Sequence, residues 1–529
     1  MFSDALRTGG VFDLSLIPIN LAFLTVIGGL LTLWGTVYVV YQTTFHPLAK
    51  YPGPFLAKLT SFHAAYNAVR GTGHYNLYDL HQKYGPFVRY GPDHISINSA
   101  TALEQIYGHK ANVQKGFWYR VFYGVSIFNA IDKDVHARKK RVMSQAFSDQ
   151  ALRGMQPHIL SAIRDWCAGL GDTTNTDASN GQWASPKDMA HWGPYMIFDS
   201  LGEICFGKTF GTSLHEDNRF FLDLMAANIR KLNIIGQMPS LKRINLDRIL
   251  LSGSWEKRQK QIAFSCKQLQ TRLQTGPGSE GRRDVIYYLQ QARHSDTGES
   301  YTEGELMSEV TLLLGAGSDT ANTAVTATFY FLSQHREVLD RLTATIRSTF
   351  ADVESIVQGP ALNSMKYLRA CIDESLRLCP PVPMPLQREV LLGGLQVDGH
   401  HFAAGTTVGV PTYSLHHNAK YFDRPYVYDP SRWLIKGTPG VLENEGRTQE
   451  EVSRAREAFA PFSIGPRSCI GKSVALIELY IGISRVLWLY DLRIAPGYEK
   501  VGVGRHGEYK MKDHFIVGKE GPILQFRRR

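Results

Sequence analysis

The stretch Phe462-Ser463-Ile464-Gly465-Pro466-Arg467-Ser468-Cys469-Ile470-Gly471 decides the fold of this 529-residue chain, because it places one cysteine in a loop rich in glycine and proline. Gly465 and Gly471 permit a tight loop and a close approach of the backbone to a flat partner. The sequence predicts a helix from Lys472 to about Trp488. Cys469 therefore lies at a helix start, where unpaired N–H groups favour a thiolate.

A buried thiolate needs a positively charged partner, and a metal ion is the natural one. Arg467 supplies a cation two residues earlier, but no second cysteine or histidine is close enough in sequence to complete a zinc site. A single thiolate suits a metal whose other positions are already filled, as haem iron is by its porphyrin. The alternative is a buried structural cysteine, because free cysteine is among the most buried residue types.

The loop resembles the haem-binding loop of the cytochrome P450 family of haem-thiolate monooxygenases at every fixed position, namely Phe462, Gly465, Arg467, Cys469 and Gly471. The resemblance implies that Cys469 is the axial ligand of the iron of haem b and that the other four residues bind this cofactor. It also implies a mainly α fold with a small β subdomain, and it covers nearly all of the chain after about Phe45.

A second motif lies within a helix predicted from Thr302 to about His335, in the segment Leu312-Leu313-Leu314-Gly315-Ala316-Gly317-Ser318-Asp319-Thr320-Ala321-Asn322. Two glycines inside a helix cost roughly 1 kcal/mol each, so they indicate a close helix crossing or a groove for a ligand. Thr320 can donate a hydrogen bond to the carbonyl of Ala316. The segment is similar to the oxygen-binding element of the family, which implies that Asp319 and Thr320 deliver protons and that Ala316 lies against the haem. Ala321 departs from the serine or threonine that is usual there.

A third motif, Glu374-Ser375-Leu376-Arg377, places a carboxylate and a guanidinium on one helix face. With Arg432 it resembles the Glu-Arg-Arg triad of the family, which implies a structural role. The resemblance also makes Arg388 a candidate for a contact with a haem propionate.

A basic helix is predicted from Asp132 to Ser148, where a charge run is most often a solvated face. His136 and Lys140 lie one turn apart, and their spacing resembles the helix that meets a haem propionate in the family. Lys140 departs from the commoner arginine, because lysine lacks the bidentate fork. We expect Arg138 and Lys139 to point outward, where they could dock an acidic reductase.

The N-terminal region has no Asp, Glu, Lys or Arg between Asp13 and Lys50. Residues 18–41 are long and apolar enough to cross a bilayer, although a signal peptide or a buried core helix gives a similar pattern. We expect a lumenal segment 1–17, a membrane anchor 18–41, a proline-rich connector 42–54 and a catalytic domain 55–529. The connector resembles fungal members of the endoplasmic reticulum, and the charge bias places the catalytic domain in the cytosol.

The overall composition is that of a globular protein, with 43% hydrophobic and 20% charged residues. Six scattered cysteines argue against a disulfide framework and for a reducing compartment. The formal charge is +10, yet basic runs interleaved with aromatic residues are missing from the sequence, so we favour a membrane surface and an acidic redox partner over nucleic acid.

The resemblance implies a monooxygenase that inserts one oxygen atom from O2 into a lipophilic small molecule. The sequence as a whole resembles fungal members of the family that act in secondary metabolite biosynthesis. Electrons would come from NADPH through a separate cytochrome P450 reductase, because residues 502–507 match G-x-G-x-x-G only by letter. The residues Phe515 and Ile516 are expected at a hairpin tip that reaches the substrate or packs in the core. Desaturation or oxidative coupling on the same fold remains an alternative, and so does a haem-binding carrier without turnover.

Overall fold

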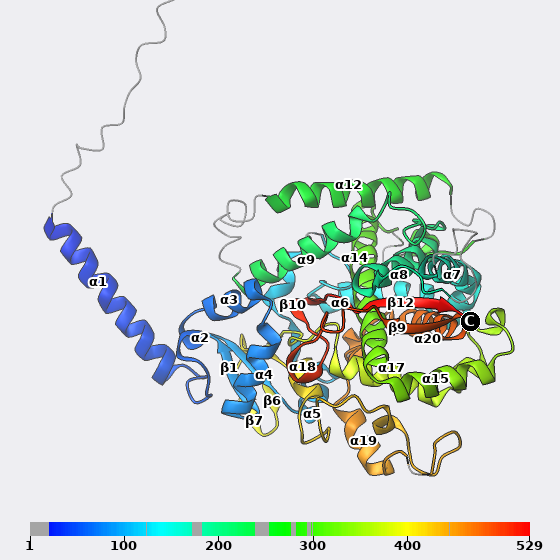
Figure 1. The fold of residues 1–529 in the computed structure, drawn as a ribbon. Coiled ribbons are helices and arrows are strands. Elements are labelled where there is room, and N and C mark those ends of the chain that lie inside the picture. Colours follow the sequence, from blue (N-terminus) through cyan, green and yellow to red (C-terminus); the bar gives the residue numbers. More distant parts are fainter. Residues whose placement is uncertain are drawn as a thin grey trace, which may run out of the picture.

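The computed structural model describes residues 21–122, 124–171, 182–238, 253–276, 282–293, 298, 300–443 and 445–529. The expected segment 1–17 and the first residues of the anchor, 18–20, lie outside these ranges. A predominantly helical body carries several small β-sheets, and one helix stands apart from it (Figure 1). This arrangement confirms the predicted mainly α fold.

The separate helix is α1 (Leu21–Val40), which continues as a π-helical turn, Tyr41–Phe45. The stretch Ala22–Phe45 has 24 residues and a mean hydropathy of 1.9, and none of its most apolar 18-residue segment is buried, which is consistent with a membrane anchor. A buried core helix is therefore the wrong interpretation of this segment. The helical turns also pass the expected boundary at residue 41: they continue through the polar residues 42–44 to Phe45 and end before Pro47, which restricts the backbone of the preceding residue.

The connector packs firmly on the body. Leu48 and Tyr51 are buried, and the buried guanidinium of Arg89 donates to the carbonyl and the side-chain oxygen of Gln42 at 2.8 and 2.6 Å. These bonds fix the end of the anchor helix against strand β1 (Phe87–Gly91). The expected stiff connector is thus non-helical after Phe45, and it holds the anchor close to the body.

The main sheet has five strands in the order β1-β2-β8-β5-β3. Strand β1 pairs antiparallel with β2 (His94–Ile97), and Phe87 lies opposite Ile97. The remaining strands of this sheet are β3 (Val113–Lys115), β5 (Arg388–Val390) and β8 (Thr407–Gly409). The smaller sheets pair β6 (Leu395–Val397) with β7 (His400–Phe402), β10 (Lys512–His514) with β11 (Ile516–Gly518), and β12 (Ile523–Arg528) with both β4 (Lys187–Asp188) and β9 (Tyr490–Ile494).

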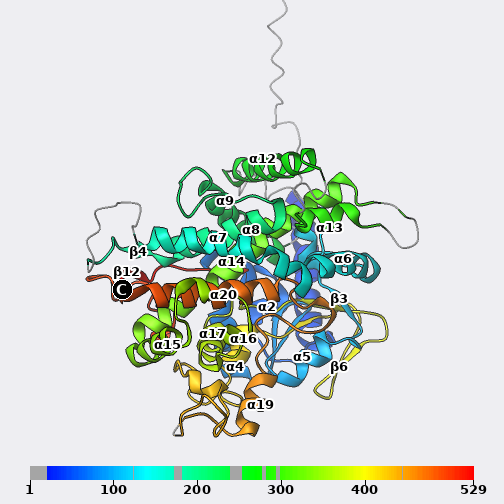
Figure 2. The same ribbon diagram turned by 90° about the vertical axis from the view of Figure 1, so that its right-hand side faces the viewer.

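The helical body surrounds one long helix, α14 (Glu303–Gln334), which crosses its centre in both ribbon views (Figures 1 and 2). Thr302 begins α14 with a capping box to Glu305, as the sequence boundary predicts. The other helices of eight or more residues are α3 (Phe62–Arg70), α4 (Gly73–Tyr84), α5 (Ala100–Tyr107), α6 (Lys133–Ala146), α7 (Asp149–Leu170), α8 (Met189–Phe206), α9 (Phe220–Gln237), α12 (Gly253–Gln274), α15 (Arg336–Thr349), α17 (Lys366–Leu378), α19 (Gln449–Glu457) and α20 (Lys472–Leu489). Shorter helices are α2 (Phe55–Leu59), α13 (Val285–Gln291), α16 (Pro360–Asn363) and α18 (Thr412–His416).

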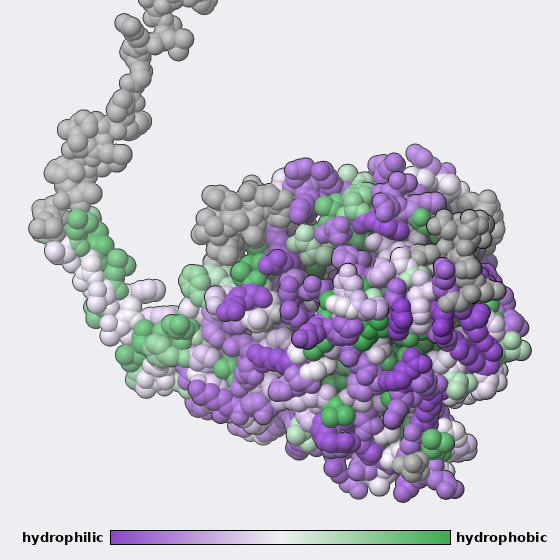
Figure 3. Space-filling view, viewed as in Figure 1, coloured by the Kyte–Doolittle hydropathy of each residue, from purple (hydrophilic) through white to green (hydrophobic). Residues whose placement is uncertain are grey.

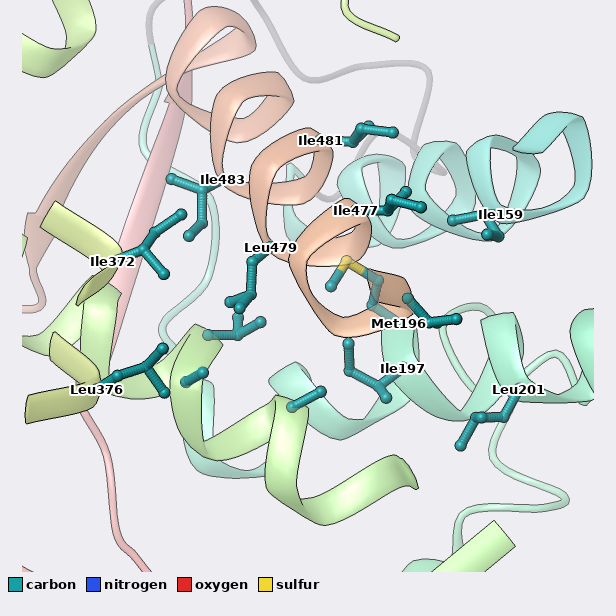
Figure 4. Close-up of a cluster of buried hydrophobic side chains, with 14 of the residues drawn as sticks. Ile159, Met196, Ile197, Leu201, Ile372, Leu376, Ile477, Leu479, Ile481 and Ile483 are labelled. Atoms are coloured by element: carbon teal, nitrogen blue, oxygen red, sulfur yellow. The ribbon is translucent and has the colours of Figure 1, made fainter. Parts of the chain in front are cut away.

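The core beside the cysteine loop is built by α20, whose apolar side chains contact α7, α8 and α17 (Figure 4). Ile477, Leu479, Ile481 and Ile483 of α20 are buried there. A Cβ on Gly482 would lie 2.9 Å from the sulfur of Met196, so α20 and α8 approach closely at this glycine. The loop that precedes α20 is therefore anchored to a closely packed interior.

Candidate active site

The cysteine loop is held in one conformation by its backbone. The N–H of Cys469 donates to the carbonyl of Phe462 at 2.9 Å. Gly465 adopts φ 70°, and a Cβ there would lie 2.0 Å from the carbonyl oxygen of Tyr107, so only glycine fits. A Cβ on Gly471 would meet only the sulfur of Cys469, at 3.9 Å. The two glycines thus act differently. Gly465 allows close contact with the backbone of Tyr107, and Gly471 leaves space beside the sulfur of Cys469.

Cys469 faces a cavity of about 390 Å³. Burial raises the pKa of its thiol, although the N–H groups of Gly471 and Lys472 oppose this change. The N–H groups at the helix start therefore favour the thiolate as expected, but the loss of solvent outweighs them. A metal cation at the sulfur would reverse the balance, since a coordinated thiol is deprotonated.

The opposite wall of this cavity belongs to α14. Ala316, Asp319 and Thr320 all line it, and the Thr320 hydroxyl donates to the carbonyl of Ala316 at 2.8 Å, as predicted. Gly317 is a close helix crossing, because a Cβ there would lie 2.8 Å from Leu201 of α8. Gly315 lines the cavity, and a Cβ on it would meet nothing within 4 Å. Each glycine therefore fits one of the two explanations that the sequence offered.

Asp319 has a partner that sequence reasoning missed. Its Oδ1 accepts from the Nζ of Lys519 at 3.0 Å, and Lys519 is only 4% exposed. Lys519 follows strand β11 directly. A separation of 200 residues leaves no periodicity or spacing that could connect the two.

Five cationic or titratable side chains converge at one end of the cavity, near the opening of a second cavity of about 470 Å³. They are the three residues predicted to meet a haem propionate, the loop residue Arg467 and one new residue: His136, Lys140, Arg388, Arg467 and Lys115. Within the described ranges, none of the five forms an ion pair with a carboxylate.

Backbone carbonyls orient these cations. Lys140 donates to the carbonyl of Pro466 at 2.7 Å, which ties helix α6 to the cysteine loop. Arg467 donates to the carbonyls of Ala130 and, at 3.0 Å, Ile131. Lysine thus replaces the commoner arginine without loss of contact with the loop.

Lys115 ends strand β3 and is almost fully buried. Its Nζ lies 4.1 Å from the ring centre of Tyr119 and 4.4 Å from that of Phe128, and it donates to the carbonyl of Phe128. Burial lowers the pKa of Lys115 well below its usual value, and the charges of Arg388 and Arg467 add to this effect. A lone lysine in a short strand carries no sequence signal for such a site.

The positive charges of this cluster of five side chains favour the binding of an anion. Burial, followed by the charges of the neighbouring arginines and lysines, lowers the pKa of His136 to about 3. Burial and the charge of Arg388 lower the pKa of Arg467 to about 10. Because buried like charges repel one another, the cluster fits an anionic group that neutralises them. Propionates of a haem whose iron meets Cys469 have the required charge and chemistry, so the residues present fit this cofactor.

The prediction that Lys139 points outward is wrong. Its side chain is 1% exposed, and its Nζ lies 3.0 Å from Oε1 of the buried Glu309 on α14. Arg138 is partly buried and pairs with Glu305. On a helix with 3.6 residues per turn, Lys139 shares the inward face with His136 and therefore connects α6 to α14.

The Glu374, Arg377 and Arg432 side chains meet in the interior as predicted. Arg377 donates to both Glu374 oxygens at 2.9 and 2.8 Å, and Arg432 donates to Glu374 at 3.4 Å. Trp433 adds an indole N–H at 2.9 Å. All three charged residues are buried, and they do not line the cavity.

Apolar side chains form much of the remaining cavity wall. Phe515 and Ile516, at the tip of the predicted hairpin, line it, and so do Met225 and Ile229 of α9. Phe515 also stacks on Trp118 with ring centres 4.4 Å apart. The cavity therefore offers a lipophilic space between the cysteine loop, α14 and the hairpin.

Comparison with known proteins agrees with this geometry. Residues 50–502 match the family model described as Cytochrome P450. The chain is 35% identical over 492 residues to cytochrome P450 monooxygenase poxM of Penicillium oxalicum, covering 93% of this chain and 92% of that protein. It is 36% identical over 517 residues to cytochrome P450 monooxygenase AKT7 of Alternaria alternata, covering 95% and 97%.

Solved structures share the fold. The heme domain of cytochrome P450DA superposes with a TM-score of 0.67 at 18% identity, covering 87% of this chain and 94% of that one. Retinoic acid-bound cyanobacterial CYP120A1 gives a TM-score of 0.64 at 20% identity, covering 85% and 93%. The chain thus belongs to the cytochrome P450 family and is an oxidoreductase of the monooxygenase type.

Proposed function

We propose that this enzyme inserts one atom of O2 into a lipophilic small molecule, most simply as a hydroxylation in fungal secondary metabolism. The observation that carries the proposal is that Cys469, Asp319 and Thr320 all line one largely apolar cavity. An apolar cavity with a few polar groups is typical of a site for a lipophilic ligand.

The cofactor we propose is haem b. Cys469 would hold its iron, while His136, Lys140, Arg388 and Arg467 would hold its propionates. Phe462, Gly471 and Ala316, which line the cavity, would border the ring, whereas Gly465, expected to bind the cofactor, would act by shaping the loop against Tyr107. The haem supplies dioxygen activation when bound, because a cysteine thiolate ligand favours O–O cleavage.

The α14 residues would move protons. The Thr320 hydroxyl donates its own hydrogen to Ala316, so its oxygen keeps lone pairs that face the cavity wall as acceptors. Asp319, beside it in sequence, has a side chain that is 26% exposed and can exchange protons with solvent. We propose that protons pass from Asp319 through Thr320 into the cavity.

The electron donor we propose is NADPH through a cytochrome P450 reductase, an acidic partner. Because Lys139 is buried, the exposed residues Lys133 and Arg141 replace it as docking candidates. They lie on α6 and line the second cavity, beside Arg467 of the cysteine loop. Long-range attraction between these cations and the acidic reductase would accelerate the association of the two proteins at low salt.

The proposed location is the endoplasmic reticulum membrane, with a single span and the catalytic domain in the cytosol. Exposed apolar residues next to α1 support contact of the body with the bilayer, namely Phe45, Phe55, Leu56, Phe62 and Tyr66. Figure 3 shows hydrophobic residues along α1 and at its junction with the body.

The test uses labelled dioxygen. Extracts of cells that produce the intact protein are compared by mass spectrometry with extracts of cells that produce Cys469→Ala. Cys266→Ala is the matched control, because Cys266 is only partly buried and contacts Met307. We expect a metabolite with one labelled oxygen that disappears in Cys469→Ala but persists in the control.

Two outcomes contradict the proposal. A product that lacks two hydrogens and carries no label indicates desaturation or coupling. Product formation that continues in Cys469→Ala overturns the assignment of the iron ligand. The same variant should also lose the carbon monoxide difference spectrum of a thiolate-bound haem.

A further inference from the structure

The ion pair between Asp319 and Lys519 is unusual in its burial. Exposed ion pairs stabilise a protein by about 0 to 1 kcal/mol. Lys519 is only 4% exposed, and an ammonium removed from water needs a partner. Among the described residues, Asp319 is the one carboxylate that forms an ion pair with Lys519. The lysine therefore has no alternative partner that would let Asp319 turn away.

Lys519 belongs to a hairpin that is itself fixed in position. The N–H of Val517 donates to the carbonyl of Pro381 at 3.1 Å, in the segment that passes along the cavity. Phe515 adopts φ 78°, a strained conformation for an aromatic residue, and its N–H donates to Asp513 at 3.0 Å. Such strain persists only where the surroundings define the conformation.

The hairpin and the residue that follows it thus contact the cavity wall at two places. Its tip contributes Phe515 and Ile516 to the wall, and the residue after its second strand binds Asp319. The charge of this pair also reaches neighbouring histidines: Asp319 raises the pKa of His514, and Lys519 lowers that of His191, although other causes are larger for both.

We propose that Lys519 is a positioning residue that fixes the orientation of the Asp319 carboxyl group for proton delivery. The inference rests on the proposed function, in which Asp319 supplies protons. It also links the substrate wall to the acid on α14, because Lys519 directly follows the hairpin that carries Phe515 and Ile516. A ligand that moves Phe515 or Ile516 would then change the position of Asp319 through only a few residues.

The experiment compares three variants of the full-length holoenzyme in lipid vesicles with NADPH–cytochrome P450 reductase and no added substrate. Lys519→Met removes the charge, Lys519→Arg keeps it, and Lys512→Met removes an exposed lysine of the same hairpin as a control. The measurements are the hydrogen peroxide released per NADPH oxidised, the solvent deuterium isotope effect on NADPH oxidation, and the melting temperature.

We expect Lys519→Met to raise the ratio of peroxide to water formed by about tenfold, which corresponds to the loss of one charge-assisted hydrogen bond. The solvent isotope effect should rise with it. Lys519→Arg should restore both values, and Lys512→Met should leave both unchanged. A lysine that only stabilises the fold would lower the melting temperature without changing the isotope effect.

Asp319→Asn separates this inference from the proposed function. If Asp319→Asn changes the peroxide ratio and the isotope effect but Lys519→Met changes neither, the positioning role is refuted and the proton role of Asp319 stands. If Asp319→Asn also changes neither, both are refuted. Should Lys519→Met lose the carbon monoxide difference spectrum, Lys519→Gln replaces it, because glutamine keeps a hydrogen-bond donor without the charge.

Discussion

The buried carboxylate of Glu374 gives the sharpest prediction about stability, and Glu374→Gln tests it. The carboxylate accepts from Arg377 at 2.8 and 2.9 Å, from Trp433 at 2.9 Å, from the N–H of Asp429 at 3.1 Å and from Arg432 at 3.4 Å. Glutamine keeps the size but removes the charge, and its amide hydrogens face donors instead of acceptors.

The expected loss in the free energy of unfolding follows from the interactions that Arg377 and Arg432 keep in the variant. Arg377 keeps hydrogen bonds to the carbonyls of His416 and Pro425, and Arg432 keeps its pair with Asp423 at 2.5 Å. Both arginines therefore keep hydrogen bonds to other partners, whereas the donors that faced the replaced oxygen lose their acceptor and the charge of Arg377 becomes uncompensated in the interior. Removal of one partner of a buried pair costs about 3 to 5 kcal/mol. Against a total stability of about 5 to 15 kcal/mol, such a loss is large.

The assay is urea unfolding followed by circular dichroism and by the haem absorbance of the same samples. Glu450→Gln is the matched control, because Glu450 pairs with Arg454 at 2.9 Å but is 85% exposed. We expect the control to change the free energy of unfolding by less than about 1 kcal/mol. A loss of the same small size in Glu374→Gln would refute the reasoning, since the buried arginines would then not need this charge.

Three further predictions concern the site and the pH dependence. Thr320→Val keeps the branched shape without the hydroxyl, so haem content should persist while more NADPH is lost to peroxide; an unchanged peroxide yield would remove Thr320 from the proton path. Gly465→Ala should lower the haem bound per protein, because its Cβ would lie 2.0 Å from the carbonyl oxygen of Tyr107, whereas Gly437→Ala, with φ 78° and open space, should not. Equal haem content in both would contradict the close contact. Burial raises the pKa of Glu508 from 4.5 to about 7, so the folded protein holds a proton that the unfolded chain releases, and the free energy of unfolding should fall as pH rises through this window. Glu508→Gln should lack that slope in urea titrations at several pH values, and a slope equal to that of the wild type would assign it to another group.

Local spacing is what the sequence could predict reliably. The bond from Thr320 to Ala316, the Glu374–Arg377 pair and the common face of His136 and Lys140 all follow from the helical repeat. The boundaries of α14 and α20 follow from capping and apolar runs. Their agreement with the structure reflects interactions that span one or two helical turns.

The sequence by itself determined the cysteine loop, the long helix with its acid and threonine, and the mainly α fold, because these depend on neighbouring residues. Only the tertiary structure decided which distant side chains complete the site. It brought Lys115 to the cation cluster and Lys519 to Asp319, and it turned Lys139 inward against Glu309. Electrostatic partners of this kind are chosen by burial in three dimensions, and a charge in the sequence does not reveal whether solvent or another charge will surround it.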